Sequence, residues 1–429
     1  MSHPASRTSP VVVVGAGAAG LMAAIFAARS GCRVLVLERT PDGGRKILIS
    51  GGGRCNILPS LLEPSRFVSD SSPHALRKIL LSWPLEGQKR FFEEEAGIPL
   101  ALEPETGKIF PAAGGARLVR DRLVLLARRL GVEIRFGSLV TGLDPPRGGE
   151  SWSVRVEPGG ALRAAAVILA SGGLSIPETG SDGIGLDLAI RLGHAVHETY
   201  PALTPLVADP AVHAHLAGVS LSVVLTAAAG RRRVVSRGGF LFTHRGYSGP
   251  AVLDISHLAA RSIRSGGARQ PILAQWTDRD AAGWEGLFRE KGGRVGALLR
   301  RHLPERLAWA LLAEAGVGPE RSLSHLLRDE RKRLVEILVR YPLPWSGDEG
   351  YGKAEATGGG VALEEVVPRT LESRIHRGLF FCGEILDAVG PIGGHNFAWA
   401  WVTGRSAGIG AGEGRSGAGA RGEEKGGEG

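Results

Sequence analysis

A strand, a glycine turn, a helix and a second strand follow one another near the start of the chain. Residues 11–14 are four consecutive valines, and a GxGxxG motif occupies residues 15–20. An Ala- and Leu-rich stretch at 21–29 then leads to a second apolar run at 33–38. Apolar runs without alternation are typical of strands buried on both faces, and two of them joined by a helix predict a βαβ unit in a parallel sheet.

Each glycine of this motif has a physical role. Gly15 permits the tight turn, Gly17 lets a diphosphate approach the backbone, and Gly20 lets helix and strand pack closely. The diphosphate would accept hydrogen bonds from free N–H groups at the positive end of the helix. Glu38, at the end of the second run, would accept hydrogen bonds from ribose hydroxyls. The motif therefore predicts a dinucleotide site, with a ligand-free glycine turn as the alternative.

The sequence favours FAD over NAD as the bound dinucleotide. Three strand-like segments at 132–143, 151–157 and 162–170 resemble the meander and returning strand of flavoproteins with two dinucleotide-binding domains. The GxGxxG spacing recurs only in the glycine-rich tail, where no strand precedes it. Nothing in the sequence therefore predicts a separate NAD(P) domain.

Composition and charge restrict the class of protein. The 429 residues are 43% hydrophobic and 22% charged, which is typical of a globular chain. Three cysteines, Cys32, Cys55 and Cys382, are too few for a disulfide framework and favour a reducing compartment. We find no signal peptide and no membrane-spanning stretch, so we expect a cytoplasmic protein. The formal charge of +9 favours anionic ligands only weakly and does not by itself indicate nucleic acid.

The pattern of apolar residues changes twice along the chain, and these changes predict the domain boundaries. From about residue 195 short β-rich runs suggest a small barrel, and 278–340 has helical spacing. The predicted divisions are a FAD-binding domain at 1–194 and 356–410, a β-barrel insert at 195–277 and 341–355, a helical subdomain at 278–340, and a disordered tail at 411–429. Within the first domain, helices are predicted at 73–97 with a break at Pro84, at 116–130 and at 183–192, and a buried strand and a closing helix at 378–382 and 396–409.

Three further segments resemble one family. Residues 44–56 read GRKILISGGGRCN, residues 241–250 read LFTHRGYSGP, and residues 379–396 read LFFCGEILDAVGPIGGHN. Together they resemble the HI0933-type (BaiN-like) flavoproteins over about residues 10–410. The resemblance implies an α/β fold in which a Rossmann-like FAD-binding domain of the glutathione-reductase type is interrupted by a β-barrel and a helical subdomain. It also implies an NAD(P)H- or oxygen-linked oxidoreductase.

The resemblance and the glycine motif together assign the cofactor contacts. Residues 44–46 are expected near the FAD diphosphate and ribityl chain, residues 50–56 beside the isoalloxazine ring, and residues 393–396 at flavin N1 and the C2 carbonyl. Glu384 stands where related flavoproteins carry an Asp that binds a ribityl hydroxyl, and Asp387 is a second candidate. The complete predicted set is Gly15, Gly17, Ala18, Ala19, Gly20, Glu38, Arg39, Gly44, Arg45, Lys46, Ser50, Gly51, Gly52, Gly53, Arg54, Cys55, Asn56, Val140, Ala170, Ser171, Gly172, Gly383, Glu384, Asp387, Gly393, Gly394, His395, Asn396 and Phe397.

Three side chains are candidates for catalysis. His395 is placed for proton exchange at the flavin, and His244 would donate a proton to substrate, although a structural role is an alternative for each. Arg54 would balance an anionic reduced flavin or a substrate carboxylate, or would form a salt bridge that shapes its loop. Cys55 has no partner at redox spacing and is expected to pack in its loop.

No metal site is expected. His213 and His215 lack a third ligand and are predicted to lie at the surface. The basic hairpin at 231–233 and the charged stretch 328–333 lack interleaved aromatic residues, so solvated surface is the expected role for both.

Three functions remain open from the sequence. The first is a FAD-dependent oxidoreductase that transfers hydride between flavin N5 and a small organic substrate, with NAD(P)H as the expected electron donor or oxygen as acceptor. The second is an RNA-binding flavoprotein in tRNA modification, although no nucleic-acid partner is expected. The third is a flavin-binding protein without turnover. The substrate, the choice among these redox partners and the oligomeric state are not predicted.

Overall fold

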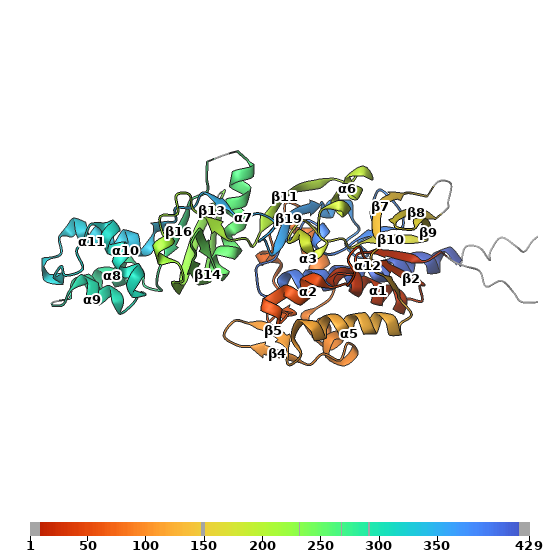
Figure 1. Cartoon of the computed structure of the whole chain (residues 1–429), viewed down its shortest axis with the longest axis horizontal. Helices are drawn as coiled ribbons and strands as arrows, with labels where there is room; N and C mark the ends of the chain where they lie inside the picture. The colour runs from red at the N-terminus through yellow and green to blue at the C-terminus, as the bar shows by residue number, and fades with distance from the viewer. Residues whose placement is uncertain (1–8, 147–150, 231, 267, 291, 420–429) are drawn as a thin grey trace, which may run out of the picture. The chain divides into compact units, whose positions relative to one another are not determined.

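The computed structural model divides the chain into two compact units. Unit 1 comprises Met1–Thr199 and Ala356–Gly429, and unit 2 comprises Tyr200–Glu355 (Figure 1). The structure describes residues 9–146, 151–230, 232–266, 268–290 and 292–419. The insert predicted to begin at 195 and end at 355 corresponds closely to unit 2. Strands β11 (Val196–Ala202) and β19 (Ala356–Val361) pair where the chain leaves and re-enters unit 1.

A five-stranded parallel sheet forms the centre of unit 1, in the order β20-β10-β1-β2-β6. Its strands are β1 (Val11–Val14), β2 (Val34–Leu37), β6 (Glu133–Arg135), β10 (Ala166–Leu169) and β20 (Leu379–Phe381). Val12 pairs with Leu35 on one side and with Val167 on the other. All residues of β1, β2, β10 and β20 are buried, as the unbroken apolar runs predicted. The fold class and the βαβ unit are therefore confirmed.

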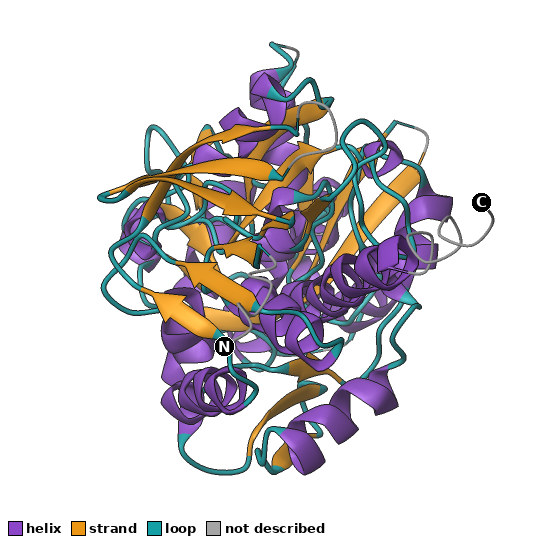
Figure 2. Cartoon of the chain, turned by 90° about the vertical axis from the view of Figure 1, so that its right-hand side faces the viewer, coloured by secondary structure: helices purple, strands orange, loops and turns teal. Residues whose placement is uncertain are grey.

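Helices α1 (Ala18–Arg29) and α12 (His395–Gly419) pack against each other in unit 1. Figure 2 shows purple helices alongside the orange strands. The closing helix predicted at 396–409 begins at His395 and continues into the segment predicted as a tail. Residues 420–429 of that predicted tail lie outside the described residues.

Two predicted strands are each two strands in the structure. The run 132–143 contains β6 of the parallel sheet and β7 (Leu139–Asp144), and the run 162–170 contains β9 (Gly160–Ala164) and β10. Strands β7, β8 (Trp152–Glu157) and β9 form the predicted meander. Gly137, at a φ of +65°, turns the chain between the first pair, and Ala165 donates its N–H to the Pro10 carbonyl between the second. Apolar content alone does not mark such a change of sheet.

A small antiparallel sheet, in the order β3-β5-β4, lies beside helical segments of unit 1. Its strands are β3 (Leu58–Pro59), β4 (Leu100–Glu103) and β5 (Lys108–Pro111). The helices of this unit include α2 (Arg45–Ile49), α3 (Pro73–Leu80), α4 (Leu85–Arg90), α5 (Gly115–Arg129) and α6 (Ile184–Arg191). The break predicted at Pro84 separates α3 from α4, so that prediction is confirmed.

Unit 2 contains a seven-stranded sheet in the order β17-β16-β13-β14-β15-β12-β18. The strands are β12 (Leu206–Val207), β13 (Ser220–Ala229), β14 (Arg232–Phe242), β15 (Gly246–Ser248), β16 (Ile272–Gln275), β17 (Tyr341–Pro342) and β18 (Gly347–Asp348). The segment between β17 and β18 forms hydrogen bonds with strands near both edges of the sheet: Leu343 N donates to the Ile272 carbonyl of β16, and Ser346 N donates to the Val207 carbonyl of β12. The sheet therefore curves back on itself, as expected of a small barrel.

Helices account for the remainder of unit 2. Helix α7 (Pro250–Arg264) packs on β13 and β14, and the predicted helical region holds α8 (Ala281–Phe288), α9 (Val295–Arg300), α10 (Glu305–Ala315) and α11 (Arg328–Val339). Each unit has its own buried apolar cluster. Among the described residues, no helix is both long and apolar enough to cross a bilayer.

Candidate functional site

The glycine turn after β1 leaves an open cradle at the start of α1. A Cβ atom on Gly20 would lie 1.9 Å from the Gly15 carbonyl oxygen, and one on Gly15 would lie 2.6 Å from that of Ala170. A Cβ on Gly17 would meet nothing within 4 Å, and no side chain caps the helix there. Two glycines therefore allow close packing, while the third borders space next to free N–H groups, which is the arrangement that binds a diphosphate.

Glu38 connects the second strand to this turn. Its buried carboxylate accepts hydrogen bonds from Ala16 N (2.7 Å), Thr40 N (2.8 Å) and Thr40 Oγ1 (2.7 Å). The adjacent Arg39 forms an ion pair with Asp182. Glu38 thus orders the backbone of the turn, and its contact with a ribose stays a prediction.

A charged cluster contains Lys46 and Glu384, two of the residues that were predicted to contact the cofactor. Lys46 Nζ donates to Glu384 Oε2 (2.5 Å) and to Ser175 Oγ (2.7 Å), and Thr357 N donates to Glu384 Oε1 (2.8 Å). Burial alone raises the pKa of Glu384, but Lys46 and the hydrogen bonds from Ser175 and Thr357 outweigh it and hold the pKa below its usual value. The carboxylate is therefore ionised at neutral pH. Ser175 and Thr357 are partners that the sequence did not predict.

Residues beside Lys46 and Glu384 make further contacts near the start of α1. Arg45 donates to Asp42 (2.7 Å), and Gly44, at a φ of +71°, precedes α2. A Cβ on Gly383 would lie 2.7 Å from the Cβ of Ala19, so residues 383–384, predicted to contact the cofactor, pack at the start of α1. The structure thereby brings the predicted residues around 18–20, 44–46 and 383–384 together.

Asp387 and Val140, which were also predicted to contact the cofactor, make their contacts elsewhere in unit 1. Asp387 is 1% exposed, and its Oδ2 atom accepts hydrogen bonds from the loop at 69–71, including Ser71 N and Ser71 Oγ at 2.8 Å. Its carboxylate is thus occupied by protein donors. Val140 is buried in the meander strand β7.

The glycine run at 51–53 adopts a left-handed backbone. The φ angles of Gly51, Gly52 and Gly53 are +56°, +65° and +84°, and Cys55 follows at +60°. Arg54 is exposed, donates to Glu103 Oε1 (3.1 Å) and lies 4.2 Å from the centre of the Phe110 ring. The alternative interpretation of Arg54 as a loop-shaping salt bridge describes these contacts. Ser50 Oγ donates to the Ile47 carbonyl (2.7 Å).

Cys55 is expected to resist alkylation in the folded protein. Burial raises the pKa of its thiol to about 12, against a smaller lowering by Ser50, and burial also raises the pKa of Cys382. The reactive thiolate is therefore scarce at pH 8. Iodoacetamide labelling followed by peptide mass spectrometry should modify the partly exposed Cys32 first and Cys55 only after denaturation. Fast labelling of Cys55 in the native protein would contradict its packing role.

The N-terminus of α12 carries a buried histidine. His395 is 3% exposed, and its ring lies against backbone groups of Ile392 and Leu61. Burial, with a smaller contribution from Arg66, lowers the pKa of His395 to about 4. The imidazole is therefore neutral at physiological pH. The Asn396 side chain forms two hydrogen bonds with the backbone of Gly390: Nδ2 donates to the carbonyl oxygen (2.9 Å), and Oδ1 accepts from the N–H (2.8 Å). The Phe397 ring stacks on Trp401.

The crossing of α12 and α1 relates the two ends of the site. A Cβ on Gly404 would lie 2.4 Å from the Ala19 carbonyl, so the helices touch at the start of α1. His395 lies nine residues earlier on α12, or about 13 Å along the helix axis. Helix α12 therefore connects the start of α1 with the segment that was predicted to lie at the flavin ring.

Buried polar atoms without partners support the same fit. Asn56 Oδ1 and Ser171 Oγ are buried and make no hydrogen bond within the described ranges. Both belong to segments that were predicted to contact FAD. Buried polar atoms are normally paired, so these are suited to a ligand. The residues present therefore fit FAD.

The predicted histidines of unit 2 have different environments. His244 is exposed in the turn between β14 and β15 of unit 2, and its role stays a prediction. His213 was predicted at the surface and that prediction is wrong: it is 5% exposed and bonded to Tyr247 (2.8 Å), Tyr341 (3.1 Å) and Glu314 (3.2 Å). Aromatic residues from distant strands bury it. His215 is exposed, as expected.

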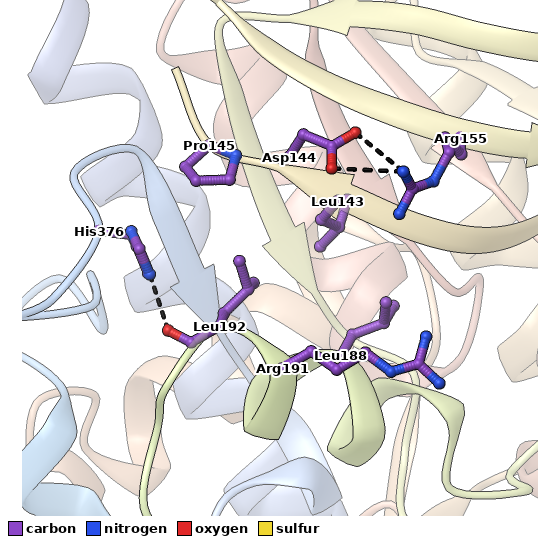
Figure 3. Close-up of a pocket in the computed structure, with 8 residues that line it drawn as sticks. All are labelled: Leu143, Asp144, Pro145, Arg155, Leu188, Arg191, Leu192 and His376. Atoms are coloured by element: carbon purple, nitrogen blue, oxygen red, sulfur yellow. Dashed lines mark hydrogen bonds and ion pairs between the residues drawn. The ribbon is translucent and has the colours of Figure 1, made fainter. Parts of the chain in front are cut away.

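Unit 1 also contains a cavity of about 330 Å³ that sequence reasoning missed. Figure 3 shows its lining: Leu143, Asp144, Pro145, Arg155, Leu188, Arg191, Leu192 and His376. Asp144 pairs with Arg155 (3.2 Å), and His376 bonds to the Leu192 carbonyl (2.8 Å). No predicted site residue lines this cavity. Its walls come from separate segments, so no local motif marks it.

The fold and the site define a Rossmann-type FAD-binding oxidoreductase. A family model described as the HI0933-like protein Rossmann domain matches residues 9–410. The chain belongs to this family and is a flavin-dependent oxidoreductase.

Individual proteins extend the comparison. The chain is 33% identical to the ribosomal RNA dihydrouridine synthase of Escherichia coli (strain K12), covering 91% of this chain and 94% of that protein. It is 31% identical to the 3-dehydro-bile acid delta(4,6)-reductase of Clostridium scindens, covering 94% and 98%. The open conformation of a flavocytochrome c3 fumarate reductase has a TM-score of 0.50 at 17% identity, covering 95% of this chain and 79% of that one, and shares the fold.

Proposed function

We propose that the chain is a reductase that saturates a carbon–carbon double bond conjugated to a carbonyl group in a small organic substrate. The observation that carries this proposal is the buried, neutral His395 at the start of α12, beside a site that fits FAD. When bound, FAD supplies two-electron hydride chemistry. Dihydrouridine formation and delta(4,6) reduction, which name two of the relatives, both saturate such a bond.

Some residues of this chain would bind the cofactor, and His395 would take part in proton transfer. The glycine turn at 15–20 would bind the diphosphate through backbone N–H groups, and Lys46 with Glu384 would hold the adjoining part of the cofactor. N–H groups at the start of α12 would stabilise negative charge on the cofactor ring. His395, neutral at pH 7, would present one N–H donor and one acceptor to a proton in transit.

The electron donor is proposed to be NADH or NADPH. Purified protein is expected to be yellow and to lose its flavin absorbance within seconds of anaerobic mixing with one of the two nucleotides. A conjugated enone and a saturated ketone of the same skeleton form the matched substrate pair, and only the enone should restore the absorbance. A yellow protein that neither nucleotide bleaches would contradict the donor, and a colourless protein that takes up no FAD would contradict the whole proposal.

A second candidate substrate is uridine in RNA, and the distribution of charge favours it. Residues 200–355 hold 22 Lys and Arg against 15 Asp and Glu, so they carry +7 of the chain's +9. Arg233 and Arg237 of β14 are exposed; Arg231 of the predicted basic hairpin lies outside the described residues. A polyanion is the ligand that such a unit attracts.

The two substrates are separated by RNA binding and by RNA chemistry. If RNA is the substrate, ribosomal RNA should bind with an affinity that falls steeply between about 50 and 200 mM salt. Ribosomal RNA from cells lacking the gene should then lack one dihydrouridine. If ribosomal RNA does not bind at low salt, RNA is excluded as the substrate and only the small-molecule proposal stands.

A further inference from the structure

One face of strand β5 lies against both glycine segments at the ring end of the site. The Cγ and Cε atoms of Lys108 lie 3.8 Å from the position that a Cβ on Gly393 would take. Phe110 Cε1 lies 3.6 Å from the equivalent position on Gly51. Residues two apart on a strand share a face, so Lys108 and Phe110 present one surface to both segments.

The start of α12 adjoins this surface. The Cβ position of Gly393 lies 3.9 Å from His395 Nδ1 and 3.8 Å from Lys108 Cε. The side chains of Lys108 and His395 therefore both adjoin Gly393, just before the first turn of α12.

The other positive groups nearby are less suited to face a ligand. His395 carries no charge at neutral pH, and Arg66, which helps to lower the pKa of His395, is exposed. Arg54 is bonded to Glu103 and stacked on Phe110. Glu103 lies opposite Lys108 in the β4–β5 register, and the charge of Lys108 contributes to the lowered pKa of Glu103, but the two Glu103 oxygens accept hydrogen bonds from Arg54 and from Thr106. Within the described residues, Lys108 has no ion-pair partner within 4 Å, and it is only partly exposed.

We infer that Lys108 supplies the positive charge that faces the pyrimidine end of the flavin ring and the substrate carbonyl. This inference rests on the proposed function. Negative charge would develop on the flavin when NAD(P)H reduces it, and on the substrate carbonyl oxygen when hydride then passes to the conjugated double bond, so a fixed cation nearby would stabilise each in turn. Neither the motif spacing nor the family resemblance had assigned a role to Lys108.

Sulfite affinity tests this inference without turnover. Sulfite binds reversibly to oxidised flavin and leaves negative charge on the pyrimidine ring, so a nearby cation tightens the complex. We expect Lys108→Gln to weaken sulfite binding, measured by loss of visible absorbance, at least about tenfold. Lys108→Arg should restore most of the affinity, and the flavin reduction potential should fall in Lys108→Gln.

Two further variants make the test specific. Lys89→Gln removes a charge from α4 that is paired with Glu86 at 2.7 Å, and it should leave sulfite affinity unchanged. Arg66→Gln removes the cation that acts on His395 and should have a smaller effect than Lys108→Gln. Equal sulfite affinity in wild type and Lys108→Gln, with FAD bound in both, would overturn the inference alone. Failure of the wild type to bind FAD would instead overturn the proposed function.

Discussion

Replacing Gly20 with alanine is expected to abolish FAD binding and to destabilise unit 1. The new Cβ atom would lie 1.9 Å from the Gly15 carbonyl oxygen and 3.0 Å from its carbon. Both atoms belong to the backbone of the turn, so the helix must move away from the strand. We expect a loss of about 3 kcal/mol in the free energy of unfolding, at the upper end of the usual cost of overpacking.

Gly17→Ala separates cofactor binding from folding. Its Cβ meets no protein atom within 4 Å, and the backbone has a φ of −77°, which alanine readily adopts. The cost to the apoprotein should stay within about 1 kcal/mol, the loss expected at a helix N-cap. The methyl group would nevertheless occupy the proposed diphosphate cradle, so FAD affinity should fall at least about tenfold.

Denaturant unfolding of the apoproteins and the ratio of flavin to protein absorbance check both variants. Gly286→Ala is the matched control, because it adds the same methyl group to helix α8 where nothing lies within 4 Å. It should stabilise the chain by up to about 1 kcal/mol and leave FAD binding unchanged. Wild-type FAD affinity in Gly17→Ala would show that the diphosphate does not lie in this turn.

The sequence predicts those parts of the fold that depend on local pattern. Four consecutive valines predict a strand covered on both faces, because such strands of a parallel sheet consist mainly of apolar residues. All four valines of β1 are indeed buried. The glycine turn follows because only glycine allows the contacts at Gly15 and Gly20. The boundary between β9 and β10 was missed because apolar residues continue through it while the chain changes partners.

The site is less predictable because its contacts join distant positions. Glu384 lies 338 residues from Lys46 along the chain, and Ser175 lies 129 from it. No spacing rule relates such residues before the sheet order is known. His213 illustrates the same limit: Tyr341, 128 residues away, helps to bury a side chain that its loop sequence placed at the surface.

The ion pair between Lys46 and Glu384 is expected to have the second large effect. Lys46→Gln leaves a carboxylate that is only 21% exposed without its counterion. Removing one partner of a buried pair costs about 3 kcal/mol at the low end, which suits this partial exposure. The loss should appear in denaturant unfolding at pH 7.

The pH dependence of this loss has a defined sign. In the wild type the pKa of Glu384 lies below its unfolded value, so its contribution is fully present at neutral pH and disappears as the pH falls through the folded pKa. In Lys46→Gln, both contributions of Lys46 that lower the pKa of Glu384 are lost, so that pKa should rise. The difference between the two proteins should therefore shrink from pH 7 towards pH 4. A difference that stays constant with pH would contradict the pairing.

The double variant Lys46→Gln/Glu384→Gln decides whether the pair serves folding or cofactor binding. The amide introduced at position 384 retains an oxygen that accepts from Ser175 and from Thr357 N, and its NH₂ group can bond to the amide introduced at position 46, so no charge is left buried. Stability at pH 7 should recover most of the loss, with little dependence on pH. If Lys46 contacts FAD as proposed, FAD affinity should still be reduced about tenfold, which matches the loss of one charge-assisted hydrogen bond. Recovery of both stability and FAD affinity would assign the pair to folding alone.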